Sequence, residues 1–142
     1  MSDTQTTLAI VKPDAVAGGH AGNILAHFER EGFTLRGLKL MRLSPEQAKA
    51  FYAVHAERPF YGSLVEFMTS GPVIAVALER EEAVTGLRAV MGATDPAEAA
   101  EGTIRRELAS SIERNAIHGS DSPENAAAEL AFFFSRSDLL EG

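Results

Sequence analysis

The chain contains no cysteine, which excludes disulfide bonds and thiolate metal sites. It has no apolar run near the 18 residues that a membrane helix needs, and Met1 to Thr4 show no signal-peptide pattern. We therefore expect a cytoplasmic protein without a membrane partner. A Walker A motif is also missing, so a P-loop cannot hold phosphate groups here.

Positive charge is in short supply, because 13 lysines and arginines stand against 20 acidic residues, for a net charge of −7. This balance argues against nucleic acid as the main ligand. It does not exclude a small phosphate ligand, because salt screens fields beyond about 8 Å and a few local cations can dominate a pocket. The length and the hydrophobic content of 45% predict one domain over residues 1–142.

The stretch NAIHGSDS, residues 115–122, places a histidine between a short apolar β-type run and the start of a helix. Ser122 and Pro123 are the residue types preferred at the N-cap and at the first helical position. The free N–H groups and the dipole of such a helix would favour an anion near His118. A lone histidine is more often a structural or surface residue, so this stretch alone leaves both interpretations open.

Apolar runs alternate with helical patterns along the chain. The runs predict strands over 6–11, 33–42, 73–78 and from 115, and helices over 23–31, 44–53, 81–91 and 123–134, with another after residue 60. The phase of the second run slips near Gly37, which predicts a β-bulge. We expect His20 and His27 on the solvent side and residues 135–142 as a frayed tail. Residues 92–114 show no clear long element, and connections of that length are usually functional or disordered.

Six separate motifs resemble those of the nucleoside diphosphate kinases, and the resemblance runs from Thr7 to about Phe134. They are VKPDAV (11–16), YAVH (52–55), RPFY (58–61), MGATDP (91–96), GTIR (102–105) and NAIHGSDS (115–122). The resemblance implies an α+β, ferredoxin-like sandwich, with a four-stranded antiparallel sheet, covering helices and a long functional loop at about 92–114. Two positions depart from the family pattern: Ala21 replaces an apolar β-branched residue, and Arg106-Glu107 replaces Gly-Asp.

The same resemblance implies a set of site residues. His118 would be the nucleophile that becomes phosphorylated, with Tyr52, Ser120 and Glu129 beside it. The cations Lys12, Arg88 and Arg105 would bind the nucleotide phosphates. Thr94 and Asn115 would be neutral donors. Phe60, with Ile112, would contact the base. No dedicated metal cage is evident, so Mg²⁺ should arrive bound to the nucleotide phosphates.

The implied activity is a two-step, ping-pong transfer from a nucleoside triphosphate to a nucleoside diphosphate, with low base and sugar specificity. ATP, GTP and deoxynucleoside diphosphates would be substrates, and the family implies a homo-oligomer, a tetramer or hexamer built from dimers. Two alternatives come from other classes: a nucleotide-binding regulatory module that no longer transfers phosphate, and a scaffold whose oligomer is its main product. Both are disfavoured because each site residue named from the resemblance is of the expected type.

Overall fold

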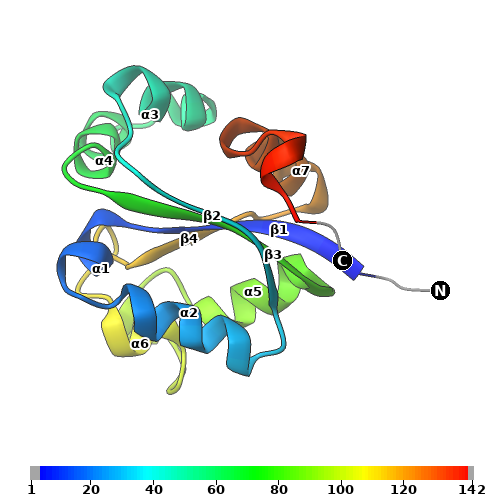
Figure 1. The fold of residues 1–142 in the computed structure, drawn as a ribbon. Helices are drawn as coiled ribbons and strands as arrows, with labels where there is room; N and C mark the ends of the chain where they lie inside the picture. Colours follow the sequence, from blue (N-terminus) through cyan, green and yellow to red (C-terminus); the bar gives the residue numbers. More distant parts are fainter. Residues whose placement is uncertain (1–3, 141–142) are drawn as a thin grey trace.

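The structure of the protein is a computed structural model that describes residues 4–140. The expectation that no signal peptide is present concerns residues 1–4, of which 1–3 lie outside the described residues, as do residues 141–142 of the predicted tail. Within them, a single antiparallel sheet has the strand order β2-β3-β1-β4 (Figure 1). Its strands are β1 (Thr4–Val11), β2 (Thr34–Met41), β3 (Val73–Glu81) and β4 (Ile117–Gly119).

Helices cover both faces of this sheet (Figure 1). One face carries α3 (Pro45–Phe51), α4 (Tyr61–Met68) and α7 (Pro123–Phe133). The other carries α1 (Pro13–Ala17), α2 (Ala21–Arg30), α5 (Ala83–Met91) and α6 (Ile104–Leu108). Three 3₁₀ turns complete the described elements: η1 (Ala53–His55), η2 (Pro96–Glu98) and η3 (Arg136–Asp138). No helix among residues 4–140 is long and apolar enough to cross a membrane.

Strand β1 lies inside the sheet and separates two hydrophobic cores. Its side chains alternate, so Leu8 and Ile10 pack in the core under α3, α4 and α7, whereas Ala9 and Val11 pack in the core on the opposite face. All four are fully buried, and burial of each leucine or isoleucine contributes about 1.5–3 kcal/mol. Because both faces are covered, a continuous apolar run suits this strand.

The β-bulge predicted near Gly37 is confirmed, because the pairing of β2 with β3 shifts register between Leu35 and Gly37. A Cβ at Gly37 would come within 3.0 Å of the Phe134 ring and 3.1 Å of Leu139, so glycine admits the C-terminal segment at this point. The prediction of a frayed tail is wrong for residues 135–140. Asp138 pairs with Lys39 at 2.9 Å, and the backbone N–H of Leu140 donates to the carbonyl of Arg36.

The 92–114 segment contains no long element, as predicted, although it includes the short η2 and α6, whose three and five residues are too few to show helical periodicity in the sequence. One further prediction needs correction. His27 is buried rather than solvent-exposed, and its Nε2 lies 3.1 Å from Oε1 of Glu107 on α6. The guanidinium of Arg106 donates to the carbonyl of Ala97 in η2. The unusual Arg106-Glu107 pair therefore attaches α6 to its neighbours.

Candidate active site

A cleft of about 690 Å³ opens beside the C-terminal end of β1 and the short strand β4. It is lined by eight of the predicted site residues: Lys12, Tyr52, Phe60, Arg88, Thr94, Arg105, His118 and Glu129. An adjoining apolar pocket of about 450 Å³ shares Lys12, Phe60 and Thr94 and adds Ile112. Residues from distant parts of the chain therefore meet around one cavity.

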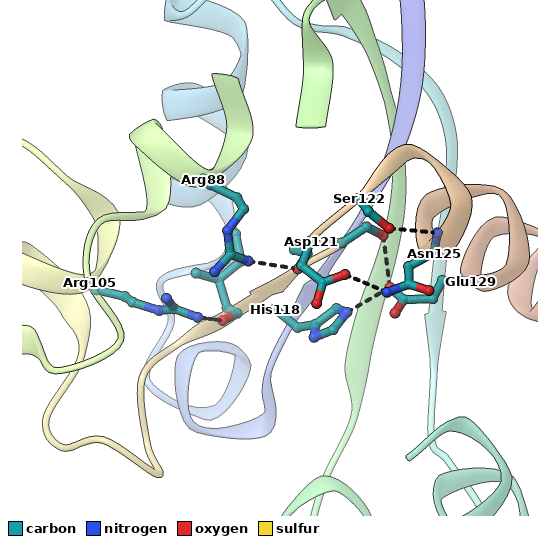
Figure 2. Close-up of polar contacts among 10 residues, drawn as sticks. Arg88, Arg105, His118, Asp121, Ser122, Asn125 and Glu129 are labelled. Atoms are coloured by element: carbon teal, nitrogen blue, oxygen red, sulfur yellow. Dashed lines mark hydrogen bonds and ion pairs between the residues drawn. The ribbon is translucent and has the colours of Figure 1, made fainter. Parts of the chain in front are cut away.

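His118 sits in the middle of β4, opposite Ile10 of β1. Its Nε2 lies 2.8 Å from Oε1 of Glu129, which extends from α7 (Figure 2). The same oxygen accepts a hydrogen bond of 2.8 Å from the hydroxyl of Ser120, a fully buried residue. An ionised carboxylate can only accept hydrogen bonds, so Nε2 donates to Glu129. This tautomer leaves the lone pair on Nδ1.

Helix α7 begins where the sequence predicts. The hydroxyl of Ser122 accepts from the backbone N–H of Asn125, and Pro123 occupies the first turn. The carboxylate of Asp121 accepts from the side-chain amide of Asn125 and lines the cleft (Figure 2). The N-terminus of this 11-residue helix thus lies next to the histidine, as expected from the Ser-Pro pair.

Aromatic side chains from the end of α3 pack against the histidine. The Phe51 ring meets the His118 ring edge-on at a centroid distance of 5.4 Å, and the Tyr52 ring does so at 6.3 Å. Burial, with a smaller contribution from Glu129, raises the pKa of Tyr52 well above its usual range. Its buried hydroxyl has no hydrogen-bond partner among the described residues. The phenol is therefore neutral and can donate to a group that enters the cleft.

Lys12 stands at the end of β1, buried and hydrogen-bonded through Nζ to Oδ1 of Asn115 at 2.8 Å. Burial, and then the nearby charge of Arg105, lower the pKa of Lys12 to about 8, although Asp14 and Glu113 act in the opposite direction. An ammonium ion that loses this much hydration without a carboxylate in direct contact is poised to bind an anion.

Two arginines complete the cationic side of the cleft (Figure 2). Arg105 projects from α6 and donates to the carbonyls of Gly92 and Ile117, at 3.2 and 2.8 Å. Burial, and then the charge of Arg88, lower its pKa to about 10, which still leaves it charged near pH 7. Arg88, on α5, donates to the carbonyl of Gly119 at 3.4 Å.

A single glycine permits this arrangement. A Cβ at Gly119 would lie 2.5 Å from the sulfur of Met91 and 3.0 Å from the side chain of Leu87. Strand β4 can therefore approach α5 closely only because residue 119 has no side chain. That approach brings Arg88 beside His118 in the same cleft.

The far end of the cleft is apolar and open. Phe60 is 46% exposed and Ile112 is 59% exposed, although both have large hydrophobic side chains. Leu64 lies between the cleft and the adjoining pocket, and His55 packs against Phe60 with ring centroids 5.5 Å apart. Exposed apolar surface beside a cationic pocket fits a ligand with a flat ring at one end and negative charge at the other.

Asn115 and Ser120 do not line the cleft themselves. Asn115 accepts a hydrogen bond from Lys12, and Ser120 donates one to Glu129, so both contact residues that line it. The sequence-based set omitted Phe51, His55 and Asp121, which also line it. The acidic residue of the HGSDS string was a usable signal for Asp121. His55 had a signal in the YAVH motif, whereas Phe51 had none, because a phenylalanine at the end of a helix usually belongs to a core. A smaller cavity of about 260 Å³ beside His27, Arg80 and Thr103 contains none of the predicted residues.

Comparison with known proteins gives a consistent result. The family model for nucleoside diphosphate kinase matches residues 5–139. A nucleoside diphosphate kinase of Campylobacter fetus is 56% identical over 95% of this chain and 98% of its own, and one of Halorhodospira halophila is 55% identical over 95% and 96%.

Solved structures agree with these sequence matches. The nucleoside diphosphate kinase of Aquifex aeolicus superimposes with a TM-score of 0.95 at 48% identity, covering 96% of this chain and 99% of that one. A halophilic nucleoside diphosphate kinase from Halobacterium salinarum, in complex with CDP, gives 0.93 at 40% identity, covering 97% and 92%. The α+β fold with a four-stranded antiparallel sheet is thereby confirmed. The chain belongs to the nucleoside diphosphate kinase family, whose members transfer phosphate between nucleoside triphosphates and diphosphates.

Proposed function

We propose that the protein transfers the γ-phosphate in two steps, through a phosphohistidine on His118. In the first step Nδ1 attacks the γ-phosphorus of a nucleoside triphosphate. A nitrogen–phosphorus bond forms, the bond to the β-phosphate oxygen breaks with its electron pair, and the diphosphate leaves. In the second step a terminal oxygen of another diphosphate attacks the phosphohistidine and restores the free imidazole.

The observation that carries this proposal is the 2.8 Å hydrogen bond between Nε2 of His118 and Glu129. It fixes the tautomer in which Nδ1 holds a lone pair, so the nucleophile needs no separate base. As Nδ1 bonds to phosphorus the ring becomes positively charged, and the carboxylate stabilises that charge. Ser120 fixes the carboxylate in turn. The Glu129 bond is thus stronger in the transition state than in the free enzyme, as catalysis requires.

Lys12, Arg88 and Arg105 are proposed to bind the phosphates. Apart from burial, a neighbouring cation lowers the pKa of two of these residues. Arg105 lowers the pKa of Lys12, and Arg88 lowers the pKa of Arg105. Such mutual repulsion is costly without an anion, and a triphosphate relieves it. Fixed cations aimed at the transferring group need no reorganisation during the reaction. Thr94 would add a neutral donor to phosphate, and Asn115 would donate toward the sugar.

Mg²⁺ is proposed to enter as part of the nucleotide substrate. The residues that the structure describes contain no cluster of three or more His, Asp or Glu side chains that could hold a metal. The cationic side chains of the cleft would bind the phosphate oxygens, those oxygens would hold the ion, and Asp121 would supply a carboxylate for it from the cleft lining. When bound, the ion would neutralise phosphate charge, while the residues named above would position and activate the reacting groups.

Base recognition is proposed to rest on Phe60 and Ile112, with the base between them. Stacking on a ring tolerates purines and pyrimidines alike, and the adjoining pocket is lined mainly by apolar side chains. Low discrimination among ATP, GTP and deoxynucleotides follows from this. The tyrosine hydroxyl of Tyr52 is proposed to donate to the phosphoryl group at His118.

Three predictions from the sequence remain untested: one domain over the whole chain, a cytoplasmic location, and a tetramer or hexamer built from dimers. We retain them as proposals. Measuring the mass of the assembly in solution would decide the last.

The direct test uses γ-labelled ATP with Mg²⁺ and a few seconds of incubation. We expect a labelled protein whose phosphate survives alkali and is lost in acid, and His118→Asn should remove the label. Label that persists in this variant would place the nucleophile elsewhere. Adding unlabelled nucleoside diphosphate to the isolated phosphoprotein should release the label as triphosphate, which also excludes a module that only binds nucleotide.

A further inference from the structure

Asp14 has no assigned role, yet it contacts the backbone on which the cleft depends. It lies in the first turn of α1, two residues after Lys12. Its Oδ2 accepts a hydrogen bond of 3.1 Å from the backbone N–H of Ala116, a residue 102 positions away in sequence. Its other oxygen, Oδ1, is buried without a hydrogen-bond partner in the described part of the chain.

Ala116 needs such support because its backbone is strained. Its φ of +73° lies in the left-handed region, which a residue with a side chain adopts only at an energetic cost. The residue is fully buried, and its carbonyl accepts from the backbone N–H of Lys12 at 2.9 Å. Asp14 and the Lys12 backbone therefore hold the N–H and the C=O of Ala116, which belong to the peptide groups before and after its Cα. The turn sends Asn115 toward Lys12 on one side and His118 into β4 on the other.

Asp14 also contributes charge. Lys12 is faced by charged groups from several elements: Arg105 from α6, Asp14 from α1 and Glu113 from the segment before β4, with Arg88, His118, Asp121 and Glu129 around the same cleft. Among those that affect Lys12, Arg105 disfavours its cationic form, whereas Asp14 and then Glu113 favour it. Burial is the largest effect, and with all of these charges in place the pKa of Lys12 is about 8. A lost negative charge at this position would leave part of the lysine neutral near pH 7.

We propose that Asp14 is a positioning residue of the transfer site, which holds the Lys12–Asn115 pair in place through Ala116 and sustains the cation through its own negative charge. The proposal rests on the phosphate-binding role proposed for Lys12. It assigns Asp14 no contact with the nucleotide. Two separable effects follow, one on geometry and one on the pH dependence of transfer.

The test compares Asp14→Asn, Asp14→Ala and Lys12→Arg by kcat/KM for ATP between pH 6 and 10. The wild-type profile should fall on the alkaline side as Lys12 loses its proton, since kcat/KM reports groups of the free enzyme. Lys12→Arg should lack that limb, because a guanidinium keeps its proton throughout this range. Asp14→Asn can still accept from Ala116 but has no charge, so its limb should shift toward lower pH. Asp14→Ala should shift it likewise and raise KM roughly tenfold at pH 6.5.

A second variant separates geometry from charge and guards against simple loss of fold. Ala116→Gly, introduced into Asp14→Ala, should recover stability and much of the KM because glycine adopts positive φ without strain. The alkaline limb of this double variant should stay shifted. Melting temperatures show which variants are folded at the assay temperature.

The possible failures are distinguishable. If Lys12→Arg keeps the wild-type alkaline limb, the role proposed for Lys12 is wrong, and the charge effect of Asp14 falls with it. If Lys12→Arg loses the limb but folded Asp14→Asn keeps it at the wild-type pH, the Asp14 proposal alone is overturned. A residue that only stabilised the fold would change the melting temperature and leave the limb in place.

Discussion

Replacement of Glu129 tests how the histidine is activated. Oε1 of Glu129 binds both Nε2 of His118 and the hydroxyl of Ser120, each at 2.8 Å. Hydrogen bonds to charged groups contribute about 1.5–3 kcal/mol. Because the bond to His118 strengthens as the ring becomes charged, Glu129→Ala should slow phosphorylation of His118 roughly 10- to 150-fold.

Two conservative variants refine this expectation. Glu129→Gln keeps an acceptor for Nε2 but loses the charge, so its rate should fall less, by roughly five- to tenfold. Ser120→Ala removes one neutral donor and leaves the His118 bond intact, which predicts a loss of about two- to tenfold. Since Ser120 acts through Glu129, the double variant Ser120→Ala/Glu129→Ala should be no slower than Glu129→Ala alone.

The measurement is a single turnover in a quenched-flow apparatus, with saturating ATP and detection of phosphohistidine. Nucleotide affinity, measured separately with a nucleoside diphosphate, should change little because Glu129 faces the ring rather than the cations. A rate for Glu129→Ala within twofold of the wild type would refute the argument. So would losses in the double variant that multiply, because they would show that Ser120 acts independently of the carboxylate.

Three more predictions follow from the cleft. Folding lowers the pKa of Lys12 from 10.5 to about 8, so between pH 8 and 10 the unfolded chain holds a proton at Lys12 that the folded chain has released. The free energy of unfolding in urea should therefore rise with pH, by at most about 3 kcal/mol relative to Lys12→Met. The same pH dependence of stability in both proteins would contradict this. Arg105→Lys cannot bridge the carbonyls of Gly92 and Ile117, so kcat should fall more than nucleotide affinity, and an unchanged kcat at saturation would exclude a transition-state role. Phe60→Ala should raise KM for ATP and CTP by a similar factor, roughly 5- to 150-fold, whereas a loss confined to one base would indicate specific recognition.

Local residue patterns were enough to predict much of this protein. The start of α7 at Ser122-Pro123 and the bulge near Gly37 each depend on a few neighbouring residues, and both are found in the structure. The family motifs then supplied the list of site residues. The site residues that line the cleft lie on separate elements. From the sequence, only the resemblance of their motifs to one family indicated that they belong to the same site.

Other features depend on contacts between distant segments, and no local pattern indicates them. His27 looked exposed because its pairing with Glu107 spans 80 positions, and α6 was missed because its five residues are stabilised by neighbours rather than by a repeating apolar face. The tail was assigned no structure because Lys39 and Arg36, which hold it, lie on β2.

The sequence by itself determined the family, the strands and main helices, and which side chains could carry phosphate chemistry, because these follow from residue types and short spacings. Only the tertiary structure decided the protonation of the site. The buried environment that lowers the pKa of Lys12, the tautomer that Glu129 imposes on His118, and the strained peptide at Ala116 all arise where β1, β4, α6 and α7 come together. Electrostatic energies depend on distance and on exclusion of water, and both are fixed only when the chain folds.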